Sequence, residues 1–185
     1  MATRSARDIA AEIRLRLPGV PKKKLHKLLY YCQGHHAATF GTALFAETIS
    51  AWDMGPVVGE LWWEEKQADG LPQQVGPRLD EAELNTIGYV ISRYGKLSGR
   101  DLEHLTHSES PWLEANETRR AAKKQRAKIQ LDVLIDFFSQ DDSEADDAEE
   151  PSLDADEVRA WLEGAQGRSG DTLSEDTPQA VLARF

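Results

Sequence analysis

Apolar residues recur at three- and four-residue intervals along most of the first 138 residues, a spacing typical of amphipathic helices. Ile9, Ile13 and Leu17 define a first helix, which ends at a Pro-Gly pair. A second helix is expected from residue 21 to about residue 40, with Gly41 as its stop signal. Strictly alternating segments are scarce. The fold class that we predict is therefore mostly α, a compact multi-helix domain.

Capping signals mark three further helix starts. Residues 80–83 (DEAE) and 98–101 (SGRD) each place an acceptor side chain three residues before a carboxylate, which is the spacing of a capping box. Residues 110–111 (SP) place a proline where the first turn of a helix accepts it. The domain is expected to end with an apolar segment that returns to the core near residue 138.

Residues 44–54 are the one place where β-branched and aromatic residues favour extended structure, so we predict a short β-hairpin there. A further helix is then expected from Pro56, with Val57 and Val58 on its apolar side. In this arrangement the tryptophan-rich segment 51–63 (AWDMGPVVGELWW) forms a turn and part of the core rather than a catalytic loop.

Charge divides the chain into two parts. The net charge is −10, but residues 1–138 carry 19 basic against 18 acidic side chains, whereas residues 139–185 carry 3 against 14. Repelling charges with few apolar groups cannot offset the entropy cost of ordering. We therefore predict a helical domain over 5–138 and an acidic disordered linker over 139–153, followed by a short helix and flexible tail over 154–185.

Several protein classes are disfavoured by the composition. Charged residues interrupt the N-terminal segment, and no stretch of eighteen apolar residues occurs, so neither a signal peptide nor a membrane span is expected. The single cysteine, Cys32, cannot form an internal disulfide, which fits a cytoplasmic protein. Neither common glycine-rich phosphate-binding motif is present, so no nucleotide cofactor is expected.

Cys32, His35 and His36 lie within one helical turn, a spacing at which zinc can bind. A structural zinc site needs four ligands, however, and the remaining histidines have no paired spacing, so a buried thiol beside helix-surface histidines is favoured. The catalytic alternative is a hydrolase with Cys32 as nucleophile and His107 as base. Cysteines on an apolar stripe are usually inert. We expect no catalytic residue, metal ion or cofactor.

His107 lies in the segment LTHSESPW, residues 105–112, which we interpret as a short polar loop between two helices. In this interpretation a hydrogen bond holds His107, and the neighbouring hydroxyl groups cap the next helix. A proton-transfer site is the less favoured alternative.

Two features are candidates for partner binding. On the helix expected after Pro56, Trp63 points about 100° away from Trp62, so it is predicted to be exposed and available to a protein partner. Residues 119–128 (RRAAKKQRAK) would place their basic side chains within an arc of about 160° on a helix. A solvated helix face is favoured over DNA binding for this stripe. The partner candidates are Trp63, Arg119, Arg120, Lys123 and Lys124.

Four segments resemble the successive motifs of one known family: KLLYYCQGHH at 27–36, LF at 44–45, AWDMGPVV at 51–58 and LTHSESPW at 105–112. Their order and spacing are similar to those of the Panacea domain, the SocA-like antitoxin domain of bacteria and phages. The resemblance covers roughly residues 5–138. It implies a largely helical domain that neutralises a toxin encoded beside it, usually in a direct complex, within toxin–antitoxin systems that include phage defence. One member of the family instead delivers its toxin to a protease.

The resemblance is carried over residue by residue as a structural signature without a catalytic role. One departure is His35, where the family often has a large aromatic residue. The matching positions are Leu28, Leu29, Tyr30, Tyr31, Gln33, Gly34, Trp52, Gly55, Pro56, Val57, His107, Pro111 and Trp112.

The function expected from the resemblance is that of an antitoxin that binds a cognate toxin protein without catalysis. A homo-oligomer is compatible with this role, and no membrane partner is expected. Two alternatives stay open: a DNA-binding regulator that uses the basic clusters at 22–27 and 119–128, and an adaptor that directs a toxin to a protease.

Overall fold

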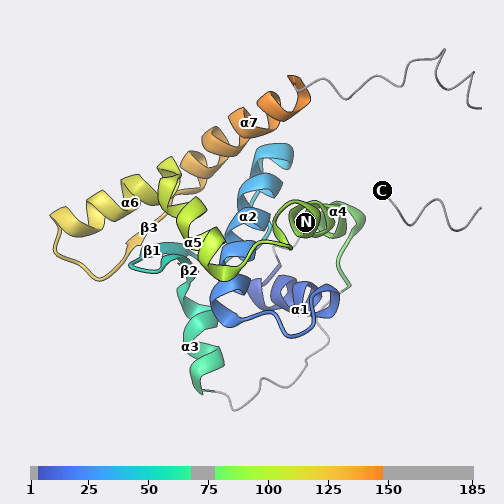
Figure 1. Ribbon diagram of the computed structural model, residues 1–185, viewed down its shortest axis with the longest axis horizontal. Coiled ribbons are helices and arrows are strands. Elements are labelled where there is room, and N and C mark those ends of the chain that lie inside the picture. Colours follow the sequence, from blue (N-terminus) through green and yellow to red (C-terminus); the bar gives the residue numbers. More distant parts are fainter. Residues whose placement is uncertain (1–3, 68–77, 148–185) are drawn as a thin grey trace, which may run out of the picture. The chain divides into compact units, whose positions relative to one another are not determined.

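Seven helices and three short strands make up the part of the chain that the structure describes (Figure 1). The computed structural model describes residues 4–67 and 78–147, with side chains as far as residue 140. The elements are α1 (Ala6–Arg16), α2 (Lys22–Phe40), β1 (Ile49–Trp52), β2 (Gly55–Val58), α3 (Gly59–Gln67), α4 (Glu81–Tyr94), α5 (Gly99–Ser108), α6 (Ser110–Ala121), β3 (Ala127–Lys128) and α7 (Leu131–Asp147).

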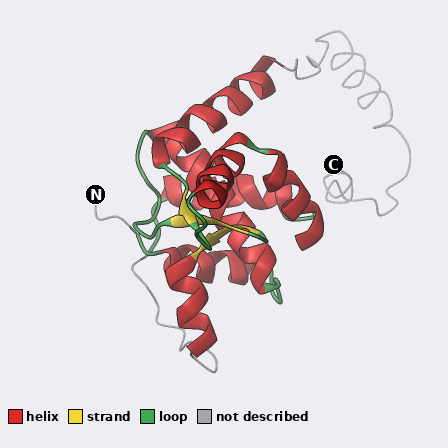
Figure 2. Cartoon of the chain, turned by 90° about the vertical axis from the view of Figure 1, so that its left-hand side faces the viewer, coloured by secondary structure: helices red, strands yellow, loops and turns green. Residues whose placement is uncertain are grey.

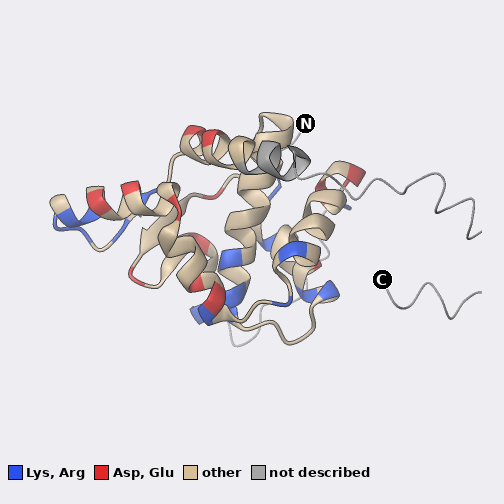
Figure 3. Ribbon diagram, turned by 45° about the horizontal axis from the view of Figure 1, so that its top comes forward, with Lys and Arg blue, Asp and Glu red and all other residues tan. Residues whose placement is uncertain are grey.

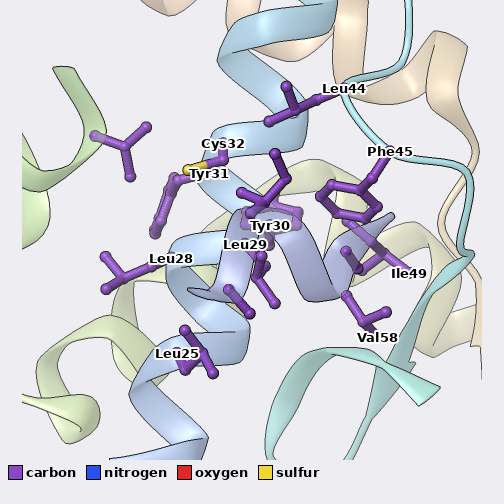
Figure 4. Packing of buried hydrophobic residues seen from close by; sticks show 14 of the residues in the cluster. Leu25, Leu28, Leu29, Tyr30, Tyr31, Cys32, Leu44, Phe45, Ile49 and Val58 are labelled. Atoms are coloured by element: carbon purple, nitrogen blue, oxygen red, sulfur yellow. The ribbon is translucent and has the colours of Figure 1, made fainter. Parts of the chain in front are cut away.

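Helix α2 forms the centre of the core. Every residue from Leu25 to Ala37 is buried, and the helix packs against α1, α4, α5 and β2. A helix that is enclosed on all sides gains stability from every face rather than from one apolar stripe. Figure 4 shows its side chains meeting Phe45, Ile49 and Val58 from the segment that follows it in the chain. The predicted fold class, mostly α with one short hairpin, is confirmed.

The predicted helix boundaries are largely confirmed by the observed caps. Asp80 begins α4 and Ser98 begins α5, each with a complete capping box. Gly41 ends α2 in the left-handed conformation, with φ of 68°. Pro111 lies in the first turn of α6, where its missing N–H costs no helical hydrogen bond. These starts and stops depend on local chemistry, which is why the sequence alone could place them.

The hairpin lies slightly later in the chain than predicted. Strands β1 and β2 pair antiparallel, with Trp52 opposite Gly55 across the two-residue turn Asp53-Met54. Gly55 has φ of 98°, a backbone conformation that residues with a side chain rarely adopt. The helix predicted from Pro56 is wrong in its first three residues, because residues 56–58 belong to β2 and α3 begins at Gly59. A short apolar run fits a fully buried strand as well as a helix.

The basic segment 119–128 is not a continuous helix, which corrects the predicted stripe. Helix α6 ends at Ala121, and Lys123 takes a positive φ of 53°. The chain then turns back, and β3 pairs with β1 to complete a sheet of order β2-β1-β3. Helices surround this small sheet (Figure 2). Strand pairing with a segment far away in sequence therefore ends the helix, and no local pattern reports such pairing.

Helix α7 returns to the core as predicted, but it extends further than expected. Leu134 and Phe138 are buried, and the helix continues to Asp147, so residues 139–147 are helical where the linker was predicted to begin. Adding residues to an established helix is far easier than nucleating one. The remainder of the linker and the short C-terminal helix lie outside the described residues, and the domain boundaries stay predictions. The described helices include none that is long and apolar enough to cross a membrane.

Gly34 is required for the contact between α2 and α7. A Cβ atom at this position would lie 2.1 Å from Cε2 of Phe138. We expect Gly34→Ala to lower the free energy of unfolding by about 2 kcal/mol through overpacking, as measured by urea denaturation. The matched control is Gly99→Ala, whose added Cβ would lie at an ordinary 3.6 Å from Lys24.

The contact between Gly34 and Phe138 predicts that the effects of substitutions at these two positions on stability are coupled. In the background Phe138→Ala, Gly34→Ala should have little further effect, because the ring that clashes is gone. Fully additive losses in the double variant would contradict the packing described here.

Candidate functional site

Three motifs that are distant in sequence meet around the β1–β2 hairpin. A Cβ atom added to Gly55 would lie 2.6 Å from Cε of Lys27 and 3.2 Å from Oγ1 of Thr106. Trp112 donates a hydrogen bond from its indole nitrogen to the carbonyl oxygen of Trp52, at 3.2 Å. Helix α2, the hairpin and the α5–α6 corner therefore pack directly against one another. Because the space beside Gly55 is filled, only glycine fits at this position.

Lys27 is the most unusual member of this cluster. Its side chain is buried, with 2% of the residue surface exposed, and the ammonium donates one long hydrogen bond of 3.4 Å to the carbonyl oxygen of Pro56. Burial lowers the pKa of Lys27 to about 8, with the carboxylate of Glu103 opposing this shift and the charge of Lys23 adding to it. Sequence analysis missed this residue because it treated residues 22–27 as one basic cluster.

The three histidines of α2 are all buried, which corrects the expectation that His35 and His36 lie on the helix surface. His35 is hydrogen-bonded to the hydroxyl of Tyr94 at 3.1 Å, and Nδ1 of His36 to the hydroxyl of Thr86 at 3.0 Å. His26 accepts a hydrogen bond from the backbone N–H of Val58 at 3.2 Å, and burial lowers the pKa of His26 to about 3. These buried imidazoles therefore connect α2 to β2 and α4.

The geometry gives little support to catalysis at Cys32 or to a metal ion beside it. Cys32 is completely buried, and burial raises the pKa of its thiol well above the ordinary value, so the reactive thiolate is strongly disfavoured. Among the described residues, no three His, Cys, Asp or Glu side chains are grouped as a metal site would require.

His107 is part of a helix rather than of a loop, which corrects its predicted setting. It lies in the last turn of α5, and its ring stacks on Trp112 at a centroid distance of 3.9 Å. Its Nε2 atom is buried and makes no hydrogen bond within the described part of the chain, and burial lowers the pKa of His107. The expected loop is absent because a single extended residue, Glu109, separates α5 from α6.

Glu109 joins the two helices to α2. Its carboxylate accepts hydrogen bonds from the hydroxyls of Tyr30 at 2.8 Å and Tyr31 at 2.7 Å. Burial raises the pKa of Tyr30, and the adjacent carboxylate raises it further, so the phenol stays protonated as a donor. Sequence analysis missed Glu109, although a buried tyrosine pair requires an acceptor and this motif supplies one.

Gln33 makes a comparable internal connection. Its side-chain oxygen accepts hydrogen bonds from the backbone N–H groups of Leu44 and Phe45, and its amide donates to the carbonyl oxygen of Phe45. Among the signature residues, Gln33 and Trp112 therefore satisfy backbone groups, and most of the others are buried in the core. Gln33 thus connects α2 to the segment that leads to the hairpin.

The partner candidates differ in their exposure. Trp63 is 45% exposed, as predicted. Arg119 is only 6% exposed, and its guanidinium donates to the carboxylate of Asp53 at 2.6 Å, so the structure removes it from the accessible surface. Arg120, Lys123 and Lys124 remain exposed, although Lys123 and Lys124 lie beyond the end of α6.

The buried ammonium of Lys27 predicts a pH-dependent stability. Because its folded-state pKa of about 8 lies below the ordinary 10.5, the unfolded chain holds the proton more tightly. The charged ammonium therefore lowers the free energy of unfolding, and this loss is complete below about pH 8. The loss disappears as the pH rises from about 8 to 10.5. We expect Lys27→Met to be more stable than the wild type at pH 7, by roughly 1–3 kcal/mol, with a difference that shrinks towards pH 10.

Urea denaturation at several pH values measures this difference. The matched control is Lys23→Met, since Lys23 lies on the same helix but is exposed. An equal effect of the two substitutions at every pH would show that Lys27 is not buried as a charged group.

Replacing the carboxylate of Glu109 with an amide should weaken the contact between the α5–α6 corner and α2. Glu109→Gln replaces one acceptor oxygen with a donor that faces a tyrosine hydroxyl. We expect the free energy of unfolding to fall by about 1–3 kcal/mol, measured by thermal and urea denaturation. Glu114→Gln, at an exposed position on α6, is the control and should have little effect. Equal stability of the two variants would contradict the proposed bracing role.

Comparison with known proteins agrees with the motifs that meet at this site. Residues 25–113 match the family model described as antitoxin SocA-like, Panacea domain. The matched segment runs from α2 to α6 and includes the hairpin, Gln33 and the α5–α6 corner. No curated protein and no solved structure matches the chain. Over residues 25–113, the chain is therefore similar to the Panacea domain of SocA-like antitoxins.

Proposed function

We propose that this protein is an antitoxin that neutralises a toxin encoded by a neighbouring gene, by direct protein–protein binding and without catalysis. The observation that carries this proposal is the match to the SocA-like Panacea domain over residues 25–113. Because the match identifies a family of antitoxins and no particular toxin, the partner is defined by its relation to this gene and by its toxicity.

The chemistry of the buried cluster supports binding over catalysis. A nucleophile or a general base must reach a substrate, and its pKa must suit proton transfer near neutral pH. Cys32 and His26 are completely buried, and their pKa values are displaced away from the reactive range. Lys27 and Glu109 are buried and engaged with neighbouring groups of the same chain. These side chains stabilise a scaffold.

A rigid scaffold favours tight binding for a physical reason. Association costs free energy whenever loops and side chains must be ordered, so a surface that is already ordered retains more of its contact energy. In this chain the hairpin is fixed by Trp112, and the segment that leads to it is fixed by Gln33. The proposed partner surface is formed by exposed residues that this framework supports.

Co-expression tests the proposal directly. The adjacent open reading frame is induced in bacteria alone and then together with this chain, and growth is followed by pull-down from the surviving cells. We expect growth arrest in the first case, and rescue with a co-purifying complex in the second. A harmless neighbour, or arrest that this chain does not relieve, would refute the antitoxin assignment.

The amount of toxin separates binding from the adaptor alternative. Rescue with undiminished toxin, recovered in a complex, supports neutralisation by binding. Rescue with toxin depleted, and toxin restored when cellular proteases are inactivated, would support delivery to a protease.

The hydrolase alternative can be tested with a double variant. Cys32→Ala combined with His107→Ala should neutralise the toxin as well as the wild type, provided that both proteins are equally abundant. Loss of neutralisation in a variant that still binds the toxin would favour the hydrolase alternative.

A further inference from the structure

The β1–β3 pair of the small sheet has a partly exposed side, which continues onto α3 as a surface of tryptophan and basic residues. In β1, Ile49 and Ala51 are buried, whereas Ser50 and Trp52 are partly exposed, so the latter two lie on the outer side. Lys128 of β3 pairs with Ser50 and therefore lies on the same side. We call this surface the Trp63 face, and its residues are Trp52, Trp63, Lys66, Arg126 and Lys128.

Several contacts show that the Trp63 face is continuous. The rings of Trp52 and Trp63 have centroids 6.4 Å apart, and the ammonium of Lys66 lies 5.1 Å from the centroid of Trp63. A Cβ atom added to Gly59 would lie 3.8 Å from the ring of Trp52 and 3.9 Å from the guanidinium of Arg126. Residues from β1, α3 and the segment that precedes β3 thus border one area.

The segment from the end of α6 to β3 carries positive charge without ion pairs in the described part of the chain, and it includes Arg126 and Lys128 of the Trp63 face. Arg120, Lys123, Lys124, Arg126 and Lys128 are all exposed, and none of them forms an ion pair with a residue that the structure describes. Figure 3 shows basic residues at the outer end of α6 and along the loop that follows it. By contrast, other arginines of the chain pair with carboxylates, as in Arg4 with Glu83, Arg7 with Glu64, Arg14 with Glu65, Arg16 with Glu12 and Arg119 with Asp53.

The buried side chain of Arg119 connects the segments that carry this surface. Its guanidinium contacts Asp53 in the hairpin turn, Asn116 within α6 and the carbonyl oxygen of Gln125 in the returning loop. One buried side chain therefore connects the turn of the hairpin to the basic loop. An interface that is ordered before binding loses less conformational entropy when it forms.

The residue types favour a protein as the occupant rather than a nucleic acid. Tryptophan and arginine are the residues that most often dominate the binding energy of protein interfaces. The face also has carboxylates close by, because the side chain of Asp53 is 85% exposed and Glu60 is exposed at the start of α3. These charges would repel a phosphate backbone, whereas a protein surface can pair with both signs.

We infer that the toxin docks on the Trp63 face, burying Trp63 and Trp52 against an apolar patch that is bordered by acidic side chains. The inference rests on the proposed function and specifies its binding surface. The exposed cations attract the acidic border, and the indole of Trp63, which is 45% exposed, supplies apolar contact area together with the exposed edge of Trp52.

The test measures the affinity of the full-length chain for the purified product of the adjacent toxic gene by calorimetry, at low and at high salt. Trp63→Ala should weaken binding at least tenfold, because truncation of a central tryptophan typically costs that much or more. The triple variant Lys66→Glu, Arg126→Glu, Lys128→Glu should weaken binding most at low salt and should reduce the salt dependence.

Two matched controls use exposed residues elsewhere. Leu15→Ala removes an apolar side chain that is 74% exposed on α1, and the pair Lys96→Glu, Arg100→Glu reverses charges at the corner between α4 and α5. Both controls should bind the toxin as the wild type does. Thermal denaturation of each variant confirms that the comparison is made between folded proteins.

The outcomes separate this inference from the proposed function. If the wild type binds the toxin and both Trp63 face variants bind equally tightly, the surface is wrong while the antitoxin role stands. If the wild type itself fails to bind or to rescue growth, the antitoxin role fails. If the triple variant keeps full toxin affinity but loses a wild-type interaction with a fluorescent DNA duplex, the face binds nucleic acid and the inference is overturned.

Discussion

The structure depends on the complete burial of α2. A helix with no solvent-exposed side over most of its length must find most partners of its polar side chains within the protein, since an unpaired polar group in the interior is costly. Gln33 does so with the backbone of Leu44 and Phe45, and the tyrosine pair does so with Glu109. These partners belong to distant segments, so satisfying α2 also fixes the hairpin approach and the α5–α6 corner around it.

Because α2 is buried, the residues that fix the fold of the domain differ from the exposed residues that would contact a partner. The motif residues on α2, β2 and α6 are mostly buried, and several of them contact one another. A family whose motifs describe the interior can retain its fold while the outer residues change with each partner. The exposed side of the β1–β3 pair and the adjoining part of α3 illustrate this arrangement, because buried Arg119 supports them while their own side chains face solvent.

The candidate site could be predicted from the sequence only in part. The motifs indicated the family, but Lys27 was grouped with the basic cluster at 22–27 and Glu109 was not recognised. Both errors have the same cause, because the environment of a side chain on an enclosed helix is set by segments far away in sequence. His35 and His36 were misplaced on the surface for this reason, since α4 covers one side of α2 and its Thr86 and Tyr94 receive these rings.

By itself the sequence determined the helical class, most helix ends and the position of a hairpin to within a few residues, because caps, glycine stops and proline starts are local interactions. Only the tertiary structure decided that residues 56–58 form a strand, that the basic segment leaves its helix after Ala121, and that Arg119 lies inside. In each case pairing or burial against a distant segment outweighed a local preference. Local patterns record what a segment prefers, whereas the free energy of the whole chain selects which preferences are realised.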